Sequence, residues 1–359
     1  MFQTIQASRG IAALLVVLFH VGITLSKDKY FGEVAESIDR IFSFGGRAGV
    51  AFFFVLSGFI ISHVHHADLG RPDRFLPYLR KRIKRIYPIY LVVFLAVFAS
   101  ALAIPSLRDT VPHDPLVILK SLLLLPQDKL VLGRTGAPVL DVAWTLQYEM
   151  VFYLAFGAAI LYRRLFWLVA ALFVANFVLQ FFADPYEFPR RFFTHHLIFL
   201  FLFGMAAAAL LRSKWVVPHP MAVVVAGALS FCGVAAWAVV VNPGEGQPLF
   251  DIGYGAASFL LIVGLTAWER AYPRGLLQWR YGGLGDASYA LYLIHYPLVS
   301  ALCKVAVRLL PKTEGSAWIA FVLIVEICVL AGLLLHRFVE RPLVQGGFVR
   351  QPALREQPA

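Results

Sequence analysis

Two residues capable of acid–base chemistry interrupt the first apolar stretch of the chain. "SRGIAALLVVLFHVGITL" (residues 8–25) contains Arg9 and, eleven positions later, His20. In an α-helix these positions differ by about 20° around the axis and about 16 Å along it, so both side chains share one face. We predict both as catalytic residues, because ionisable groups within membrane spans are rare and tend to be functional. The alternative is that Arg9 reaches lipid headgroups and His20 bonds a neighbouring helix.

A carboxylate in a later apolar stretch is the expected partner of that imidazole. Glu149 lies in "VAWTLQYEMVFYL" (142–154). If this span descends from the outer surface, Glu149 is about 12 Å deep and His20 about 9 Å deep, so the two groups can meet. A carboxylate beside an imidazole orients the ring and raises its basicity. We therefore predict Glu149 as a third catalytic residue; the alternative is a structural hydrogen bond without chemistry.

Two stretches between His20 and Glu149 in the sequence carry small and basic residues, respectively. In "GVAFFFVLSGFIIS" (49–62), Gly49, Ser57 and Gly58 permit close helix approach or line a narrow passage. In "RKRIKRIYPIYL" (80–91), Arg82 and Arg85 are one helical turn apart. Guanidinium groups form paired hydrogen bonds with phosphate, so this pair suits a phosphate-bearing ligand. The alternatives are helix packing for Ser57 and lipid headgroup contact for the arginines.

A histidine near the end of the chain is surrounded by aromatic residues. "GDASYALYLIHYPLV" (285–299) places His295 about nine residues inside a span, close to Tyr292. We predict that Tyr292, His295 and Trp144 contact the substrate, the alternative for His295 being a hydrogen-bonded core histidine. "HVHH" (63–66) sits at the cytoplasmic end of a predicted span and has no cysteine nearby in sequence, so we expect no metal site.

The elements that must position these residues are membrane helices. The chain of 359 residues is 60% hydrophobic and 15% charged, unlike a soluble domain. We predict an all-α, polytopic integral membrane protein with about ten spans: 9–26, 46–66, 85–104, 141–162, 165–183, 193–212, 219–241, 250–269, 286–310 and 316–338. "PLVILKSLLLLP" (115–126) is too short to cross and is bounded by prolines, so we expect an interfacial or re-entrant helix there.

The distribution of positive charge predicts the orientation. The net charge of +11 fits the excess of Lys and Arg in cytoplasmic loops, so we do not expect nucleic acid binding. Its strongest block, "RPDRFLPYLRKRIKR" (71–85), is cytoplasmic if the N-terminus is cytoplasmic. Ten spans then return the C-terminus to the same side. We predict a transmembrane domain over residues 1–341 and a short cytoplasmic tail over 342–359.

In order along the chain, several stretches resemble the acyltransferase 3 family of integral membrane O-acyltransferases, especially its exopolysaccharide-modifying group. The stretches are Arg9 with His20, "FFFVLSGFIIS", "RIKRIYPIY", "WTLQYEMVFYL", "SYALYLIHYPL" and "HRFVERPL". The resemblance implies about ten spans and transfer of an acyl group from cytoplasmic acyl-CoA to a sugar hydroxyl on the far side. It also implies that Arg9 and His20 are the essential pair and that Glu149 and the arginines around 82–85 assist.

On this resemblance we expect acetyl-CoA, or another acyl-CoA, as a co-substrate and no permanently bound cofactor. Its phosphates would meet Arg82 and Arg85, and its pantetheine arm would pass Ser57. The expected acceptor is a polysaccharide or lipid-linked sugar, and the expected location is a bacterial inner membrane. Direct transfer and an acyl-His20 intermediate both remain open. The other open functions are a transporter or flippase of a lipid-linked glycan and a non-catalytic partner of polysaccharide assembly. Two kinds of protein partner also stay open: a second copy of this chain, in a homo-oligomer, and the polysaccharide-assembly machinery.

Overall fold

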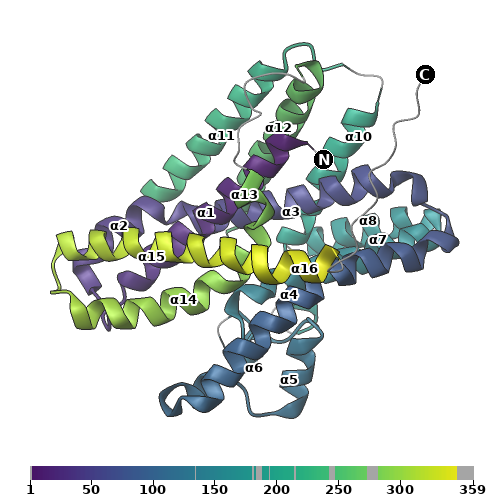
Figure 1. Ribbon diagram of the computed structural model, residues 1–359. Helices are drawn as coiled ribbons and strands as arrows, with labels where there is room; N and C mark the ends of the chain where they lie inside the picture. The colour runs from purple at the N-terminus through teal and green to yellow at the C-terminus, as the bar shows by residue number, and fades with distance from the viewer. Residues whose placement is uncertain are drawn as a thin grey trace, which may run out of the picture.

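The predicted all-α fold class is confirmed. The computed structural model describes residues 2–133, 135–179, 182, 188–193, 195–213, 216–241, 247–272 and 282–345, and its regular secondary structure there is helical (Figure 1). Each predicted span coincides with a helix: α1 (Gln3–Leu25), α3 (Phe44–His65), α4 (Phe75–Ala103), α7 (Trp144–Leu161), α8 (Arg163–Leu179), α10 (Leu197–Arg212), α11 (Pro220–Val241), α12 (Pro248–Ala271), α14 (Ser288–Leu309) and α15 (Glu314–Leu335).

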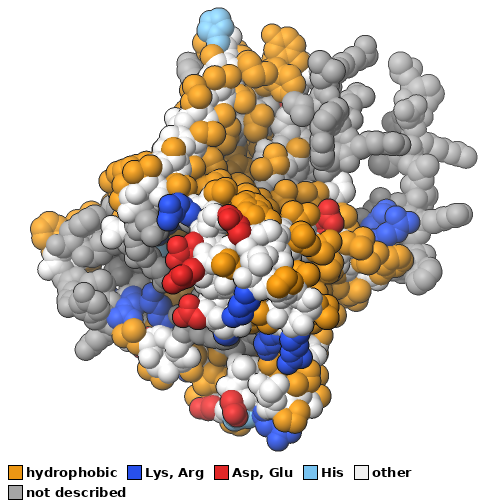
Figure 2. Space-filling model, turned by 90° about the vertical axis from the view of Figure 1, so that its left-hand side faces the viewer, with side chains coloured by type: hydrophobic (Ala, Val, Ile, Leu, Met, Phe, Trp, Pro, Cys, Tyr) orange, Lys and Arg blue, Asp and Glu red, His pale blue; other side chains and the backbone are white. Residues whose placement is uncertain are grey.

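Eight helices in the described part of the chain are long and apolar enough to cross a membrane. The two predicted spans not among them are α7, which carries Gln147 and Glu149, and α8, which has 17 residues. The chain is therefore a multi-pass membrane protein, while the count of ten spans stays a prediction. Figure 2 looks at the end of the bundle near α2 (Glu36–Phe42) and the α14–α15 turn. Charged side chains gather there, and hydrophobic side chains cover much of the flanks.

The segment expected at the interface forms a helix too short to span. α5 (Pro115–Leu122) has eight residues and is about 12 Å long, against a hydrocarbon core of about 30 Å. The Asp114 side chain caps its N-terminus by accepting from the Leu116 amide. Tyr90 on α4 donates a hydrogen bond to the Ser121 carbonyl and ties α5 to α4. The remaining short helices are α6 (Lys129–Leu132), α9 (Arg190–Phe193), α13 (Gly282–Asp286) and α16 (Arg341–Gln345).

Both ends of the described chain lie at the same end of the bundle. Gly10 approaches Gly285 and His20 contacts His295, so α1 and the α13–α14 segment run parallel in a constant register. α15 runs antiparallel to α14, with the Cys328 thiol 3.9 Å from the His295 carbonyl oxygen. α1 therefore begins where α15 ends.

Several helix boundaries differ from the predictions, most of all the start of α4, which lies at Phe75 rather than near residue 85. α1 begins at Gln3 rather than near residue 9, because the Glu269 carboxylate of α12 accepts hydrogen bonds from the Gln3 and Thr4 amides and the Thr4 hydroxyl. Arg9 is thus one and a half turns inside α1. At the other end, a π-helical turn (His336–Glu340) and α16 continue α15 past residue 341, where the tail was expected to begin. Residues 346–359 of that tail lie outside the described residues.

α3 is a central helix because its small residues let two others approach its backbone. A Cβ at Gly49 would lie 2.7 Å from the Ala12 carbonyl oxygen of α1. A Cβ at Gly58 would lie 2.1 Å from the Phe201 carbonyl oxygen of α10, and one at Gly204 of α10 would lie 1.8 Å from the Val55 carbonyl oxygen. Both roles predicted for residues 49–62, close helix packing and lining of a passage, are therefore found. Gly49 and Gly58 allow close packing, and Ser57 lines the cavity described below.

We predict that Gly58→Ala destabilises the fold by about 3 kcal/mol or more, because the added methyl group meets backbone rather than a movable side chain. Gly233→Ala in α11 is the matched control, since a Cβ there meets nothing within 4 Å. That control should be neutral or stabilising by up to about 1 kcal/mol. Thermal melting of the purified proteins in detergent measures both. Equal melting temperatures for the two variants would contradict the close contact of α3 with α10.

Candidate active site

A cavity of about 790 Å³ opens among α1, α3, α4, α7, α13–α14 and the turn that follows α15. Its wall carries both cationic side chains and hydroxyl, carboxylate and aromatic groups. The polar and aromatic residues among those that line it are Gln6, Arg9, Phe53, Phe54, Ser57, Lys81, Arg82, Lys84, Arg85, Thr145, Glu149, Tyr153, Asp286, Ser288, Tyr289, Tyr292, His336, Glu340 and Arg341.

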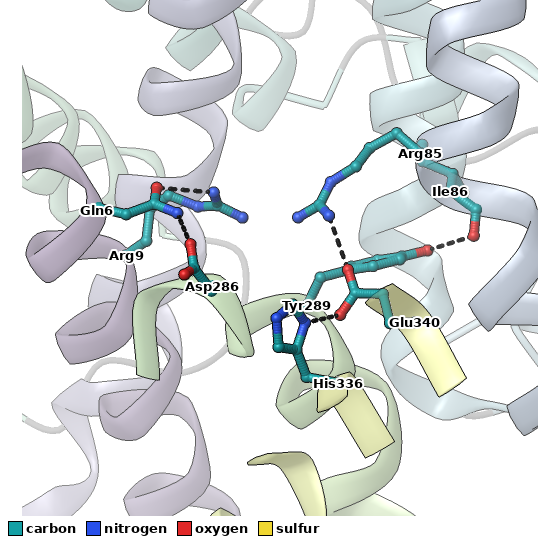
Figure 3. Close-up of polar contacts among 8 residues, drawn as sticks. All are labelled: Gln6, Arg9, Arg85, Ile86, Asp286, Tyr289, His336 and Glu340. Carbon is teal, nitrogen blue, oxygen red and sulfur yellow. Dashed lines mark hydrogen bonds and ion pairs between the residues drawn. The ribbon is translucent and has the colours of Figure 1, made fainter. Parts of the chain in front are cut away.

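Two guanidinium groups face each other across this cavity. Arg9 comes from α1 and Arg85 from α4, and their guanidinium groups point toward one another over an open space (Figure 3). Arg9 donates to the Gln6 side-chain oxygen at 3.1 Å, and the Gln6 amide in turn donates to Asp286. Like charges that approach in this way repel, so the arrangement favours an anion between them.

The support for Arg85 comes from the far end of the sequence. Arg85 donates to Glu340 with a nitrogen–oxygen distance of 2.7 Å, and Glu340 also bonds His336 Nδ1 at 2.8 Å. The Glu340 side chain is 1% exposed, whereas that of Arg85 is 33% exposed. Glu340 therefore fixes one edge of a guanidinium that remains open to the cavity. Glu340 was not predicted as a site residue, although it lies in the "HRFVERPL" stretch.

Arg82 has the environment expected of a ligand-binding cation. Its guanidinium carbon lies 6.0 Å from the Tyr78 ring centroid and 5.8 Å from that of Tyr153. Its Nε atom is buried and has no hydrogen-bond partner among the described residues. A buried donor without an acceptor is costly in a folded protein, so this position suits an incoming oxyanion.

The predicted contact between Glu149 and His20 is wrong. Glu149 accepts hydrogen bonds from the Ser57 hydroxyl at 2.9 Å and the Tyr153 hydroxyl at 2.5 Å. The depth estimate failed because α7 starts inside the bundle: Thr145, in its first turn, hydrogen-bonds Tyr292 of α14 at 2.8 Å. Glu149 lies one turn further along α7, on the cavity wall. Tyr153 was not predicted as a site residue. Its position four residues after Glu149 places both side chains on the same face of α7, and this spacing could have indicated it.

His20 is paired with the second predicted histidine. His20 Nδ1 lies 2.9 Å from the Val16 carbonyl oxygen and 3.2 Å from His295 Nε2, and His295 Nδ1 lies 3.2 Å from the Leu291 carbonyl oxygen. Carbonyl oxygens only accept, so in the neutral pair both rings carry their proton on Nδ1. The single Nδ1–H of His20 is then shared between the Val16 carbonyl oxygen and His295 Nε2, which leaves the lone pair of His20 Nε2 available as a base.

Tyr292 stands between the cavity and this histidine pair. It lines the cavity, donates to the Val142 carbonyl at 3.1 Å, and has its ring centroid 5.8 Å from that of His295. Neither histidine lines the cavity, and neither does Trp144, whose ring contacts Tyr148. His20 keeps partial exposure beside Phe19 and Tyr296.

The structure thus brings six of the nine predicted site residues to one cavity and places three beyond it. Those in the cavity are Arg9, Ser57, Arg82, Arg85, Glu149 and Tyr292, and the others are His20, Trp144 and His295.

We predict that Glu340→Ala lowers the free energy of unfolding by about 1–3 kcal/mol, because it leaves Arg85 and His336 without their shared acceptor. Glu340→Gln should lose less, since its amide oxygen still accepts from Arg85. Thermal melting in detergent measures the difference. A fully stable Glu340→Ala protein would show that the bridge contributes nothing to the fold.

Comparison with known proteins places the chain in a family. Residues 2–337 match the acyltransferase domain of the acyltransferase 3 family. The chain is 29% identical to the exopolysaccharide production protein ExoZ of Rhizobium meliloti, over 89% of this chain and 96% of that protein. It is 28% identical to the acyltransferase MdmB of Streptomyces mycarofaciens, over 94% and 90% respectively.

A more distant relative is longer than this chain. The peptidoglycan O-acetyltransferase OatA of Listeria monocytogenes is 23% identical over 96% of this chain but only 56% of its own length. No solved structure matches the chain. Because the family match covers nearly the whole membrane bundle and most of the residues that line the cavity, the chain belongs to the acyltransferase 3 family and is a membrane acyltransferase.

Proposed function

We propose that the protein transfers an acyl group, acetyl in the first instance, from acyl-CoA to a hydroxyl group of a polysaccharide or lipid-linked sugar. The names of its relatives ExoZ and OatA refer to exopolysaccharide production and to O-acetylation of peptidoglycan, which supports a sugar acceptor. The membrane is the bacterial inner membrane, with the cavity mouth and both termini on the cytoplasmic side. The basic block at 71–85, which leads into α4, supports this orientation.

The observation that carries the proposal is the concentration of cations around an open cavity. Arg9, Arg82 and Arg85 all line it, together with Lys81 and Lys84. Coenzyme A carries a diphosphate and a ribose phosphate, and arginine suits phosphate because it binds two oxygens at once. The phosphates bind among these cations, and the pantetheine arm extends past Ser57 toward Tyr292. A volume of about 790 Å³ lies within the range of small-molecule sites.

His20 acts as the base in the transfer step. Its Nε2 takes the proton of the sugar hydroxyl as that oxygen attacks the thioester carbonyl. The carbon–oxygen bond forms, the carbon–sulfur bond breaks, and the proton passes to the departing thiolate of coenzyme A. In the alternative route, the acyl group is first transferred from coenzyme A to His20 and then from His20 to the sugar hydroxyl, with the same products. In both routes His295 orients the ring, which is the role predicted for Glu149.

Glu149 belongs to the donor side of this scheme. It holds the Ser57 and Tyr153 hydroxyl groups on the cavity wall, and Tyr153 also faces the Arg82 guanidinium. Glu149 thus arranges the wall along which the pantetheine arm passes. The acyl group reaches His20 beside Tyr292, whose displacement opens the way between the two.

We predict that Arg82→Ala raises the KM for acetyl-CoA by about 10- to 100-fold, the loss expected for one or two charge-assisted hydrogen bonds. With acetyl-pantetheine, which lacks the phosphates, the variant and wild type should react alike. Arg74→Ala is the matched control, because Arg74 lies just before α4 outside the cavity and pairs with Asp73. Unchanged kinetics of Arg82→Ala with acetyl-CoA would remove Arg82 from the donor site.

We also predict that His20→Ala lowers transfer by at least about 100-fold while acetyl-CoA binding stays intact. His295→Ala should lower transfer less, because the base, His20, is still present and has lost only the residue that orients its ring. The measurements are the acetyl content of the secreted polysaccharide and thioester cleavage by the purified protein with an acceptor sugar. Normal acetylation by a folded His20→Ala protein would exclude this mechanism. Failure of the wild type to cleave the thioester would favour a glycan transporter.

A further inference from the structure

An acidic residue lies on the lipid-facing surface of the bundle, far from the cavity. Glu326 is the thirteenth of the 22 residues of α15, and its side chain is exposed. The residues around it on the same face are apolar and also exposed: Ile319, Val322, Leu323, Ile327, Leu330 and Leu334. Carboxylates within a span almost always face a protein interior or a partner, because hydrocarbon does not solvate them.

The Glu326 carboxylate cannot reach the membrane surface by extending its side chain along the helix. Glu326 is about 18 Å from the start of α15 and about 14 Å from its end, and a glutamate side chain is too short to reach either surface. Within the described part of the chain, Glu326 has no hydrogen bond or ion pair. A carboxylate in this position calls for a partner from outside this chain.

The neighbouring helix exposes a side chain of opposite charge. Lys304 on α14 is exposed and is likewise without a bonded partner among the described residues. α14 and α15 lie side by side and antiparallel (Figure 1). Their register follows from the contacts of Cys328 with the His295 carbonyl and of Gly332 with Leu291.

This register fixes how far apart in depth Lys304 and Glu326 lie. Lys304 is level with Ile319, seven residues or about 10 Å from Glu326 along the axis. Because Cβ atoms tilt toward the start of their own helix and the two helices run in opposite directions, the two side chains lean toward each other's depth. Glutamate and the long lysine chain together can span that offset between adjacent molecules.

We propose that α14 and α15 form a homodimer interface with a second copy of this chain. A two-fold axis along the membrane normal keeps both copies at the same depth and gives an isologous interface. Lys304 of each copy then pairs with Glu326 of the other, so one surface satisfies both charges twice. The exposed apolar residues of α15 pack around these pairs. This interface is independent of the proposed function, because none of its residues lines the cavity.

Charge exchange tests the interface. The full-length chain, fluorescently labelled and reconstituted at low density in lipid bilayers, is counted by single-molecule photobleaching. Wild type should bleach in two steps. Glu326→Lys and Lys304→Glu should each lower the dimer fraction at least tenfold, and the double exchange should restore it. Glu33→Lys, which changes an exposed acidic residue between α1 and α2, should leave the dimer unchanged.

A second measurement keeps the proposal testable if a charge exchange prevents folding. Leu330→Cys lies one turn from Glu326 on the same face, and in a Cys232→Ser background the native thiols left are the buried Cys303 and Cys328. Oxidation in membranes should give a band of dimer size. A monomeric wild type, a folded double exchange that stays monomeric, or crosslinking only to a different protein would each overturn the proposal.

Discussion

The structure depends on holding several cationic side chains around a cavity inside an apolar bundle. Arg9 and Arg85 face each other across it, and Arg82 buries a donor without an acceptor. Water screens such charges poorly in a partly buried site, so their mutual repulsion must be offset. Glu340 and the Gln6–Asp286 pair offset part of it and fix the direction of each guanidinium. In the proposed function, the bound anionic ligand offsets the rest.

The helices are arranged so that distant segments meet at this cavity. Gly58 and Gly204 bring α3 against α10, and Gly49 brings α3 against α1. This close packing fixes α3, so that Ser57 points at Glu149 of α7. The parallel pairing of α1 with α14 places His20 beside His295, just beyond the wall that Tyr292 forms. In the proposed function, donor binding and base catalysis would therefore take place in two adjacent parts of one bundle.

The fold was largely predictable from the sequence, because long apolar stretches can satisfy their backbone in a membrane only as helices. The charge pattern predicts Arg9, Arg82 and Arg85 on the same side of the membrane, and the structure brings all three to one cavity. The partner of Glu149 was not predictable by the same reasoning. Depth was counted from the membrane surface, whereas the loop before α7 enters the bundle and the helix starts inside it. Glu340 pairs with Arg85 across 255 positions, a separation that no local pattern encodes.

The most direct test is a structure of the protein in lipid with a non-reactive thioether analogue of acetyl-CoA. The account predicts that the diphosphate lies between Arg9 and Arg85 with an oxygen bonded to Arg82. It also predicts that the acetyl end reaches Tyr292 on the side toward His20. An analogue bound outside the cavity, or with its phosphates away from these arginines, would contradict the account.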